Sequence, residues 1–203
     1  PGNHPFYSFD DWFIGKSQVR SGVPEQWQRL SLTYSSTDPD SLDRVLAANA
    51  GKVACVITEP EDAIPNPPET IRAIQRIARK HGVVFILDEM VTGFRAGLPG
   101  TYTELGLEPD MTTWGKAIGN GFSFCALAGK AEIMDLGGIR DNERQRVFLL
   151  SSTHGGEAHT LAAARAVLRT YRESDVIGFH RRRVSEVAAG MRRILAAHRL
   201  ADN

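Results

Sequence analysis

The fold is decided by one stretch of the sequence, Val83-Val84-Phe85-Ile86-Leu87-Asp88-Glu89-Met90. Its run of five apolar residues is typical of a strand that is buried on both faces. Carboxylates are rarely buried without a partner, so Asp88, which ends the run, is a candidate site residue. Ligands of open α/β sheets bind beyond the carboxyl ends of the strands, and Asp88 is expected at such an end.

A lysine follows this acid in a glycine-rich setting, Thr112-Thr113-Trp114-Gly115-Lys116-Ala117-Ile118-Gly119-Asn120-Gly121. A lysine amine can form a Schiff base with a carbonyl cofactor, and a nearby aspartate can hold a pyridinium nitrogen. Asp88 and Lys116 are therefore predicted to form one site. The alternatives are a surface position for Lys116 and a structural salt bridge for Asp88. Glu89 points the opposite way along a strand and is expected to be structural.

Composition places the chain among ordinary globular proteins. It has 203 residues, of which 42% are hydrophobic and 24% charged, and Lys+Arg balance Asp+Glu at 24 each. The balanced charge does not favour nucleic acid or a membrane surface as a partner, and no apolar run approaches the ~20 residues of a membrane span. Cys55 and Cys125 lie in apolar stretches and are predicted to be buried free thiols, which favours a cytoplasmic location.

The first half of the chain predicts a βαβ unit. After loop-like residues 1–35, a short helix is expected to begin at Asp38-Pro39 and to run to about Asn49. A buried strand follows at Val53–Thr58 and ends at a second carboxylate, Glu59. An amphipathic helix over Glu69–His81 then leads into the strand Val83–Leu87, which indicates a parallel sheet.

The second half predicts further strands and two long helices. The expected elements are a strand ending at Trp114, a strand over Phe122–Gly129, and helices over Lys130–Leu136, Ala158–Tyr171 and Asp175–Leu200. Hydroxyls and glycines at 151–156, just before the first long helix, are suited to binding an anion. The second long helix carries an apolar stripe, and its run Arg181-Arg182-Arg183 is interpreted as a solvated face.

Four motifs follow one another along the chain: Ile57-Thr58-Glu59-Pro60, the stretch from Leu87 to Arg95, the stretch from Pro109 to Gly121, and Thr153-His154-Gly155-Gly156-Glu157. In this order they resemble the class III pyridoxal-phosphate-dependent aminotransferases. Asp-Trp-Phe-Ile-Gly at 11–15 and Ser-Gly-Val-Pro at 21–24 look most like the glutamate-1-semialdehyde 2,1-aminomutase branch. The resemblance implies an α/β fold, the fold-type I large domain, with a mostly parallel mixed sheet flanked by helices.

The resemblance also implies a division of the chain and an activity. Residues 1–174 would be the central part of the cofactor domain, and 175–203 a long helix leading toward a C-terminal small domain. The N-terminal phosphate-binding turn and a C-terminal substrate-binding arginine of the family have no counterpart in the sequence. The implied enzyme moves an amino group through a lysine internal aldimine and a quinonoid intermediate of pyridoxal 5'-phosphate (PLP), as an aminotransferase or an aminomutase.

Each motif carries over specific roles. Lys116 would bind the cofactor and move the proton between Cα and C4′, and Asp88 would pair with the ring nitrogen. Met90 matches the position that packs under the ring. The other implied contacts come from Thr153 to the phosphate of the partner subunit's cofactor in a homodimer, from Phe6 to the ring, and from Glu59 to the substrate. Phe6 stands where many relatives carry a Tyr-His-Gly turn, so a hydroxyl contact there is lost.

Other interpretations of the sequence remain open. Plain packing is the alternative for Phe6, and helix capping is the alternative for Thr153. The whole chain is alternatively a catalytically incompetent remnant that binds or dimerises without turnover. A nucleotide-binding module is disfavoured because neither a phosphate loop nor a dinucleotide fingerprint is present. His154 and His159 lack further ligands at suitable spacing, so no metal site is expected. The expected partners are a small-molecule amino donor and acceptor.

Overall fold

The computed structural model describes residues 20–60, 67–138 and 154–200. Within these ranges the centre is a four-stranded sheet in the order β1-β2-β3-β4. The strands are β1 (Cys55–Thr58), β2 (Val84–Asp88), β3 (Met111–Trp114) and β4 (Ala126–Gly129). β1, β2 and β3 run parallel, and β4 is antiparallel to β3. The expected α/β fold with a mostly parallel mixed sheet is confirmed.

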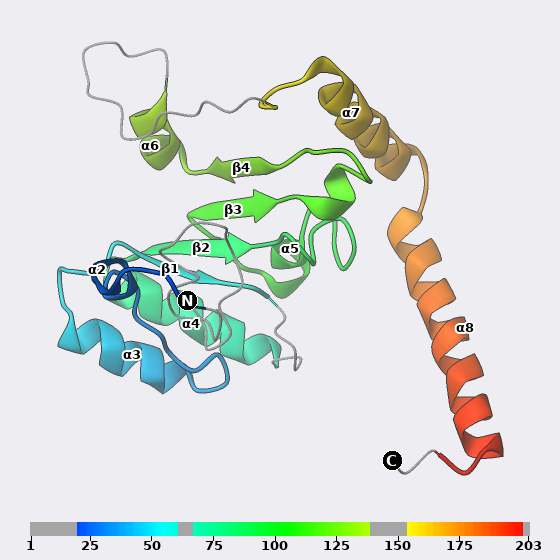
Figure 1. Cartoon of the computed structure of the whole chain (residues 1–203), viewed down its shortest axis with the longest axis horizontal. Coiled ribbons are helices and arrows are strands. Elements are labelled where there is room, and N and C mark those ends of the chain that lie inside the picture. Colours follow the sequence, from blue (N-terminus) through cyan, green and yellow to red (C-terminus); the bar gives the residue numbers. More distant parts are fainter. Residues whose placement is uncertain (1–19, 61–66, 139–153, 201–203) are drawn as a thin grey trace.

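Seven α-helices and two 3-10 turns are described in these ranges (Figure 1). The helices are α2 (Glu25–Gln28), α3 (Pro39–Ala48), α4 (Pro68–Lys80), α5 (Thr101–Leu105), α6 (Ala131–Met134), α7 (Ala158–Glu173) and α8 (Val176–Ala197). The turns are η1 (Lys116–Ile118) and η2 (Asp135–Gly137). Local sequence explains two helix starts: Asp38 accepts a hydrogen bond from the Asp40 amide at 3.1 Å, and Asp175 accepts one from the Gly178 amide at 2.9 Å.

The core lies between the sheet and the helices α3 and α4, which cover one face of it (Figure 1). Side chains alternate along β2, so Phe85 and Leu87 point into this core. Val84 and Ile86 point to the other face and are only half-buried, unlike the two-sided burial expected from the apolar run. Asp88 comes two residues after Ile86, so its side chain points to the same face as Val84 and Ile86, away from α3 and α4.

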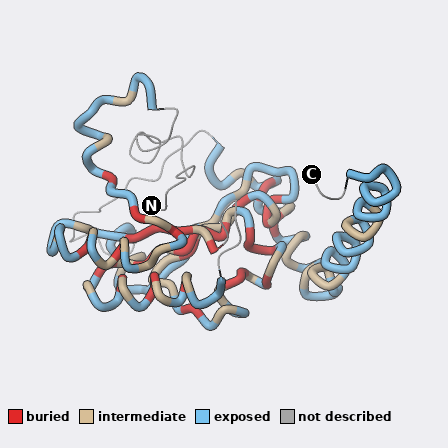
Figure 2. The backbone as a smooth tube through the Cα atoms, turned by 90° about the horizontal axis from the view of Figure 1, so that it is seen from below, coloured by how far each residue is buried: buried red, intermediate tan, exposed pale blue. Residues whose placement is uncertain are grey.

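The two long helices lie at the far side of the sheet from α3. α8 extends away from the sheet, and all of its residues are exposed or half-buried (Figure 2). Two contacts hold the corner between α7 and α8 to the rest of the chain. The Tyr171 hydroxyl donates to the Phe94 carbonyl in the loop after β2, and Arg181 pairs with Glu104 of α5 at 2.8 Å. In the ranges that the structure describes, no helix is long and apolar enough to cross a membrane.

Besides the two-sided burial expected of β2, two further sequence-based predictions are wrong in detail. The strand expected over Phe122–Gly129 begins only at Ala126, because Phe122 still closes a turn onto the Gly119 carbonyl at 3.0 Å. Cys55 and Cys125 are free thiols as predicted, but both are exposed and not buried. Each lies at or next to a strand on an edge of the described sheet, where apolar neighbours in sequence do not guarantee cover.

Candidate active site

Asp88 ends β2 as a buried carboxylate, with only 4% of the residue exposed. Its Oδ1 accepts hydrogen bonds from the Met90 amide at 2.9 Å and from the Thr113 hydroxyl at 3.0 Å. Among the described residues, Oδ2 has no hydrogen bond and neither oxygen has a cationic partner. A buried carboxylate of this kind is suited to a cation supplied by a ligand, because burial without a counter-charge is costly.

The neighbouring Glu89 is fully buried and its carboxylate is satisfied by the protein itself. Oε1 accepts from the Thr101 hydroxyl at 2.7 Å and from the Tyr102 amide at 3.0 Å, and Oε2 accepts from the Thr92 hydroxyl. These donors tie the loop after β2 to the start of α5. These contacts agree with the structural role expected for Glu89. Burial raises the pKa of the Tyr102 phenol, and the negative charge of Glu89 raises it further.

Lys116 begins the turn η1 directly after β3, in the left-handed backbone conformation with φ +48°. This conformation disfavours residues with a side chain and is found at functional sites held in place by their surroundings. Asn120 and Gly121, with φ +43° and +97°, complete the tight turn. The Lys116 side chain is exposed, and the described residues give its amine no hydrogen bond or ion pair.

Strand pairing brings the Asp88 and Lys116 segments to one end of the sheet. Asp88 on β2 is paired in parallel register with Thr113 on β3, and Lys116 follows three residues after Thr113. The carboxyl ends of parallel strands lie at the same edge of a sheet, where α/β proteins bind ligands. Glu59 also lies at this edge, because it follows β1, whose last residue Thr58 is paired with Leu87.

The Met90 side chain lies against the backbone just before Lys116. A β-carbon built on Gly115 would be 2.5 Å from Met90 Cε and 2.7 Å from Met90 Sδ, so the thioether occupies the space beside this glycine. Met90 thus bridges the two segments, with its amide on Asp88 and its thioether at Gly115. Phe6 and Thr153, the other sequence-predicted cofactor contacts, lie outside the described residues.

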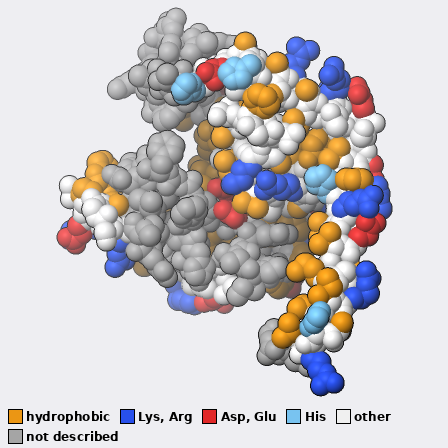
Figure 3. Space-filling model, turned by 45° about the vertical axis from the view of Figure 1, so that its right-hand side comes forward, with side chains coloured by type: hydrophobic (Ala, Val, Ile, Leu, Met, Phe, Trp, Pro, Cys, Tyr) orange, Lys and Arg blue, Asp and Glu red, His pale blue; other side chains and the backbone are white. Residues whose placement is uncertain are grey.

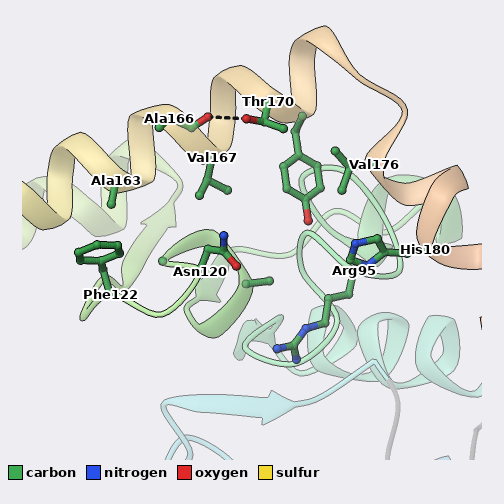
Figure 4. A pocket seen from close by; sticks show the side chains of 12 residues that line it. Arg95, Asn120, Phe122, Ala163, Ala166, Val167, Thr170, Val176 and His180 are labelled. Atoms are coloured by element: carbon green, nitrogen blue, oxygen red, sulfur yellow. Dashed lines mark hydrogen bonds between the residues drawn. The ribbon is translucent and has the colours of Figure 1, made fainter. Parts of the chain in front are cut away.

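A cavity of about 540 Å³ lies between the turn that follows Lys116 and the helix α7 (Figure 4). Asn120 and Phe122 from the turn face Ala163, Val167 and other residues of α7 across it. The Thr170 hydroxyl, also on this wall, is already used by a hydrogen bond to the Ala166 carbonyl at 3.0 Å. Neither Asp88 nor Lys116 lines this cavity, so the cavity lies beside the candidate site and does not contain it.

Sequence reasoning missed Thr113 as part of the site. Its hydroxyl contacts Asp88, and its carbonyl accepts the Glu89 amide at 3.0 Å. Thr113 could have been recognised from its position three residues before Lys116, on the strand that pairs with the strand of Asp88. Reading that signal requires the pairing register, which the sequence alone does not supply.

Comparison with known proteins adds to this geometry. The sequence profile of the family "Aminotransferase class-III" matches residues 26–202, which is most of the chain. The chain belongs to the class-III aminotransferase family. The match includes Asp88, Met90, Lys116 and Glu59, so all described candidate residues lie inside the region of class-III similarity.

Curated relatives of this class-III chain include glutamate-1-semialdehyde 2,1-aminomutases. That of Aeropyrum pernix is 38% identical over 165 residues, which are 79% of this chain and 37% of the relative. That of Deinococcus radiodurans is 33% identical over 178 residues, 85% of this chain and 38% of the relative. The class-III chain thus spans less than two fifths of the length of these relatives.

Solved structures support the same fold. The FumI protein of Sphingopyxis sp. MTA144, in its PLP internal aldimine form, aligns with a TM-score of 0.84 at 24% identity, over 97% of this chain and 47% of that one. An omega-transaminase of Sphaerobacter thermophilus aligns with a TM-score of 0.75 at 21% identity, over 83% of this chain and 42% of that one. At these identities the likeness concerns the fold.

Proposed function

We propose that this chain is the central, cofactor-binding part of a PLP-dependent class-III aminotransferase or aminomutase. One observation carries the proposal: the buried carboxylate of Asp88 has no cationic partner among the described residues and lies at the same sheet edge as the Lys116 turn. The cofactor offers both complements, a pyridine nitrogen that carries a positive charge when protonated and an aldehyde that reacts with a lysine amine.

The residues present fit this group. Asp88 Oδ2, free of hydrogen bonds within the described residues, would accept from the protonated ring nitrogen, and the buried negative charge would keep that nitrogen protonated. Lys116 would hold the cofactor by its amine and then carry the proton between the substrate Cα and C4′. When bound, PLP supplies the electron-accepting ring on which amino-group transfer depends.

Three further contacts belong to the proposal. Met90 would pack against the ring, since its thioether lies between the Asp88 and Lys116 segments. Glu59 would face the substrate, because β1 ends at the same edge of the sheet. Thr153 would contact the phosphate of the partner subunit's cofactor in a cytoplasmic homodimer, and Phe6 would stack on the ring.

The domain division at residue 174 is also proposed. α8 extends from the rest of the chain and leaves an apolar stripe exposed, with Arg side chains on its other side (Figure 3). The residues of this stripe are Val184, Val187, Met191, Ile194 and Leu195. A helix with such a stripe is stabilised by packing it against another element, which supports the proposal that α8 leads toward a second domain.

The experiment is reductive trapping on the 203-residue chain. The purified chain is incubated with PLP, reduced with sodium borohydride and digested, and the modified peptide is located by mass spectrometry. The cofactor is expected on Lys116 and absent from Lys116→Ala, while Lys52→Ala, which removes another exposed lysine, retains it. Modification at other lysines, or in Lys116→Ala to the same extent, would contradict the assignment.

Turnover separates the proposed enzyme from a binding remnant. An amino donor such as a simple amino acid, mixed with the PLP-loaded chain, is expected to convert the cofactor to its amine form, which changes the visible spectrum. Specific trapping at Lys116 without any such conversion would instead favour a module that binds or dimerises without turnover.

A further inference from the structure

Thr113 connects the two functional segments by a side-chain contact and not only by strand pairing. It lies opposite Asp88 in the β2–β3 register, and its Oγ1 donates to Asp88 Oδ1 at 3.0 Å. Its own carbonyl accepts the Glu89 amide at 3.0 Å, which fixes the strand position on both sides of this contact. The chain then reaches Lys116 within three residues.

The contact engages one oxygen of the Asp88 carboxylate, Oδ1, and leaves Oδ2 without a hydrogen bond among the described residues. Oδ1 accepts both from Thr113 and from the Met90 amide, which lies on the same turn as Asp88. Two donors from different segments on a single oxygen restrict rotation of the carboxylate about its Cβ–Cγ bond, because hydrogen bonds weaken steeply when their angles change. Oδ2 is then held in one direction, and the described residues supply no donor to it.

We propose that Thr113 is a positioning residue that orients the Asp88 carboxylate so that Oδ2 is presented to the ring nitrogen of the cofactor. The inference rests on the proposed function and adds to it a residue that acts through Asp88. Because Lys116 follows Thr113 by three residues, just beyond the end of β3, the same residue links the position of the Asp88 carboxylate to that of the lysine. The hydroxyl of Thr113 thus orients the Asp88 carboxylate, and its strand leads to Lys116, the two residues that would bind one rigid ring.

The neighbouring Thr112 provides a matched control. It is the same residue type on the same strand, but it points to the opposite face, where it is 4% exposed. Thr112→Val and Thr113→Val both exchange a hydroxyl for a methyl group at nearly constant volume. Only the second removes a donor to Asp88, and Thr113→Ser restores that donor.

The test compares PLP with its 1-deaza analogue, in which a C–H group replaces the ring nitrogen. Dissociation constants of both probes are measured for the wild-type chain and the variants, after circular dichroism and thermal melting show that the unloaded variants fold. Wild type, Thr112→Val and Thr113→Ser are expected to prefer PLP. Thr113→Val is expected to lose about tenfold in PLP affinity, the effect of one hydrogen bond to a charged group, with deaza affinity unchanged.

The outcomes separate the two levels of inference. Equal losses of affinity for both probes in Thr113→Val would show a merely structural role for Thr113. No loss of affinity for either probe would show that the hydroxyl does not position Asp88. Both results overturn the inference and leave the assignment of Lys116 and Asp88 intact. If the wild-type chain binds both probes equally, the role of Asp88 at the ring nitrogen is itself wrong, and the role of Thr113 fails with it.

Discussion

The thioether of Met90 occupies the space that a β-carbon on Gly115 would need, at 2.5 Å from Cε and 2.7 Å from Sδ. Gly115 has an extended backbone with φ −165°, which any residue can adopt. The glycine is therefore explained by the close approach of Met90 and not by its backbone conformation. This packing joins the end of β2 to the residue before Lys116.

Gly115→Ala should displace the Met90 thioether with little loss of stability. The clash involves the far end of a flexible side chain, so we expect the unfolding free energy to fall by less than about 1.5 kcal/mol. The Met90 methyl resonance in a ¹³C-methyl spectrum should shift, and the affinity for PLP should fall severalfold. Gly137→Ala, where a β-carbon would meet nothing within 4 Å, should leave both unchanged. An unmoved Met90 signal in Gly115→Ala would contradict the packing.

Glu89→Ala should be strongly destabilising. The residue is fully buried and accepts three hydrogen bonds, so its truncation leaves the Thr92 and Thr101 hydroxyls and the Tyr102 amide without their acceptor. We expect a loss of about 2–4 kcal/mol in unfolding free energy, measured by urea denaturation. Glu108→Ala removes an exposed ion pair with Arg79 and should cost no more than about 1 kcal/mol. Similar values for the two variants would refute a structural role for Glu89.

Arg181→Ala should loosen the base of α8. The Arg181 guanidinium donates to the Ala96 carbonyl at 2.7 Å and pairs with Glu104, whereas Arg183 pairs with Glu186 inside α8 itself. We expect faster hydrogen exchange of backbone amides in residues 94–104 and in the first turns of α8 for Arg181→Ala, and no change in residues 94–104 for Arg183→Ala. Equal protection in both variants would mean that α8 is held by other contacts.

Asp110→Asn should reduce stability in a pH-dependent way. Asp110 Oδ2 accepts the Phe85 amide at 2.7 Å, and Oδ1 pairs with Lys130 at 2.6 Å. Burial acts to raise the pKa of this carboxyl, but the hydrogen bonds from Lys130 and Phe85, with the positive charges of Lys130 and Arg79, hold the pKa below its ordinary value of 3.8.

The sign of the effect follows from this lowered pKa. The charged carboxyl stabilises the folded chain above pH 3.8, and this contribution is lost as the pH falls through the lower pKa of the folded state. Denaturation at pH 7 should therefore show Asp110→Asn about 1–2 kcal/mol less stable than wild type. The difference should shrink toward pH 3; a difference that grows on acidification would have the wrong sign.

Much of the fold could be predicted from local patterns. The amphipathic spacing around Ile71 and Ile74 identified α4 to within one residue at each end, and the apolar run before Asp88 identified β2. These predictions succeed because side-chain period and capping residues act over short stretches of chain. The family motifs around Asp88 and Lys116 likewise lie in continuous sequence.

Edge burial and side-chain partners could not be predicted in this way. Whether Cys55 is covered depends on which strand lies at the edge of the sheet, and the acceptor of the Thr113 hydroxyl lies 25 residues away. Both depend on strand order and register, which packing of the whole sheet decides.

The sequence by itself determined the strands, the amphipathic helices and the order of the class-III motifs, because each is written in contiguous residues. Only the tertiary structure decided that Asp88 is buried with one oxygen engaged by Thr113 and Met90, while Glu89 beside it is satisfied by three donors. Strand alternation predicts opposite directions for these two adjacent carboxylates, but it does not say which donors surround each of them. Strand alternation sends them to opposite faces, where different neighbours leave one suited to a ligand and make the other a structural residue.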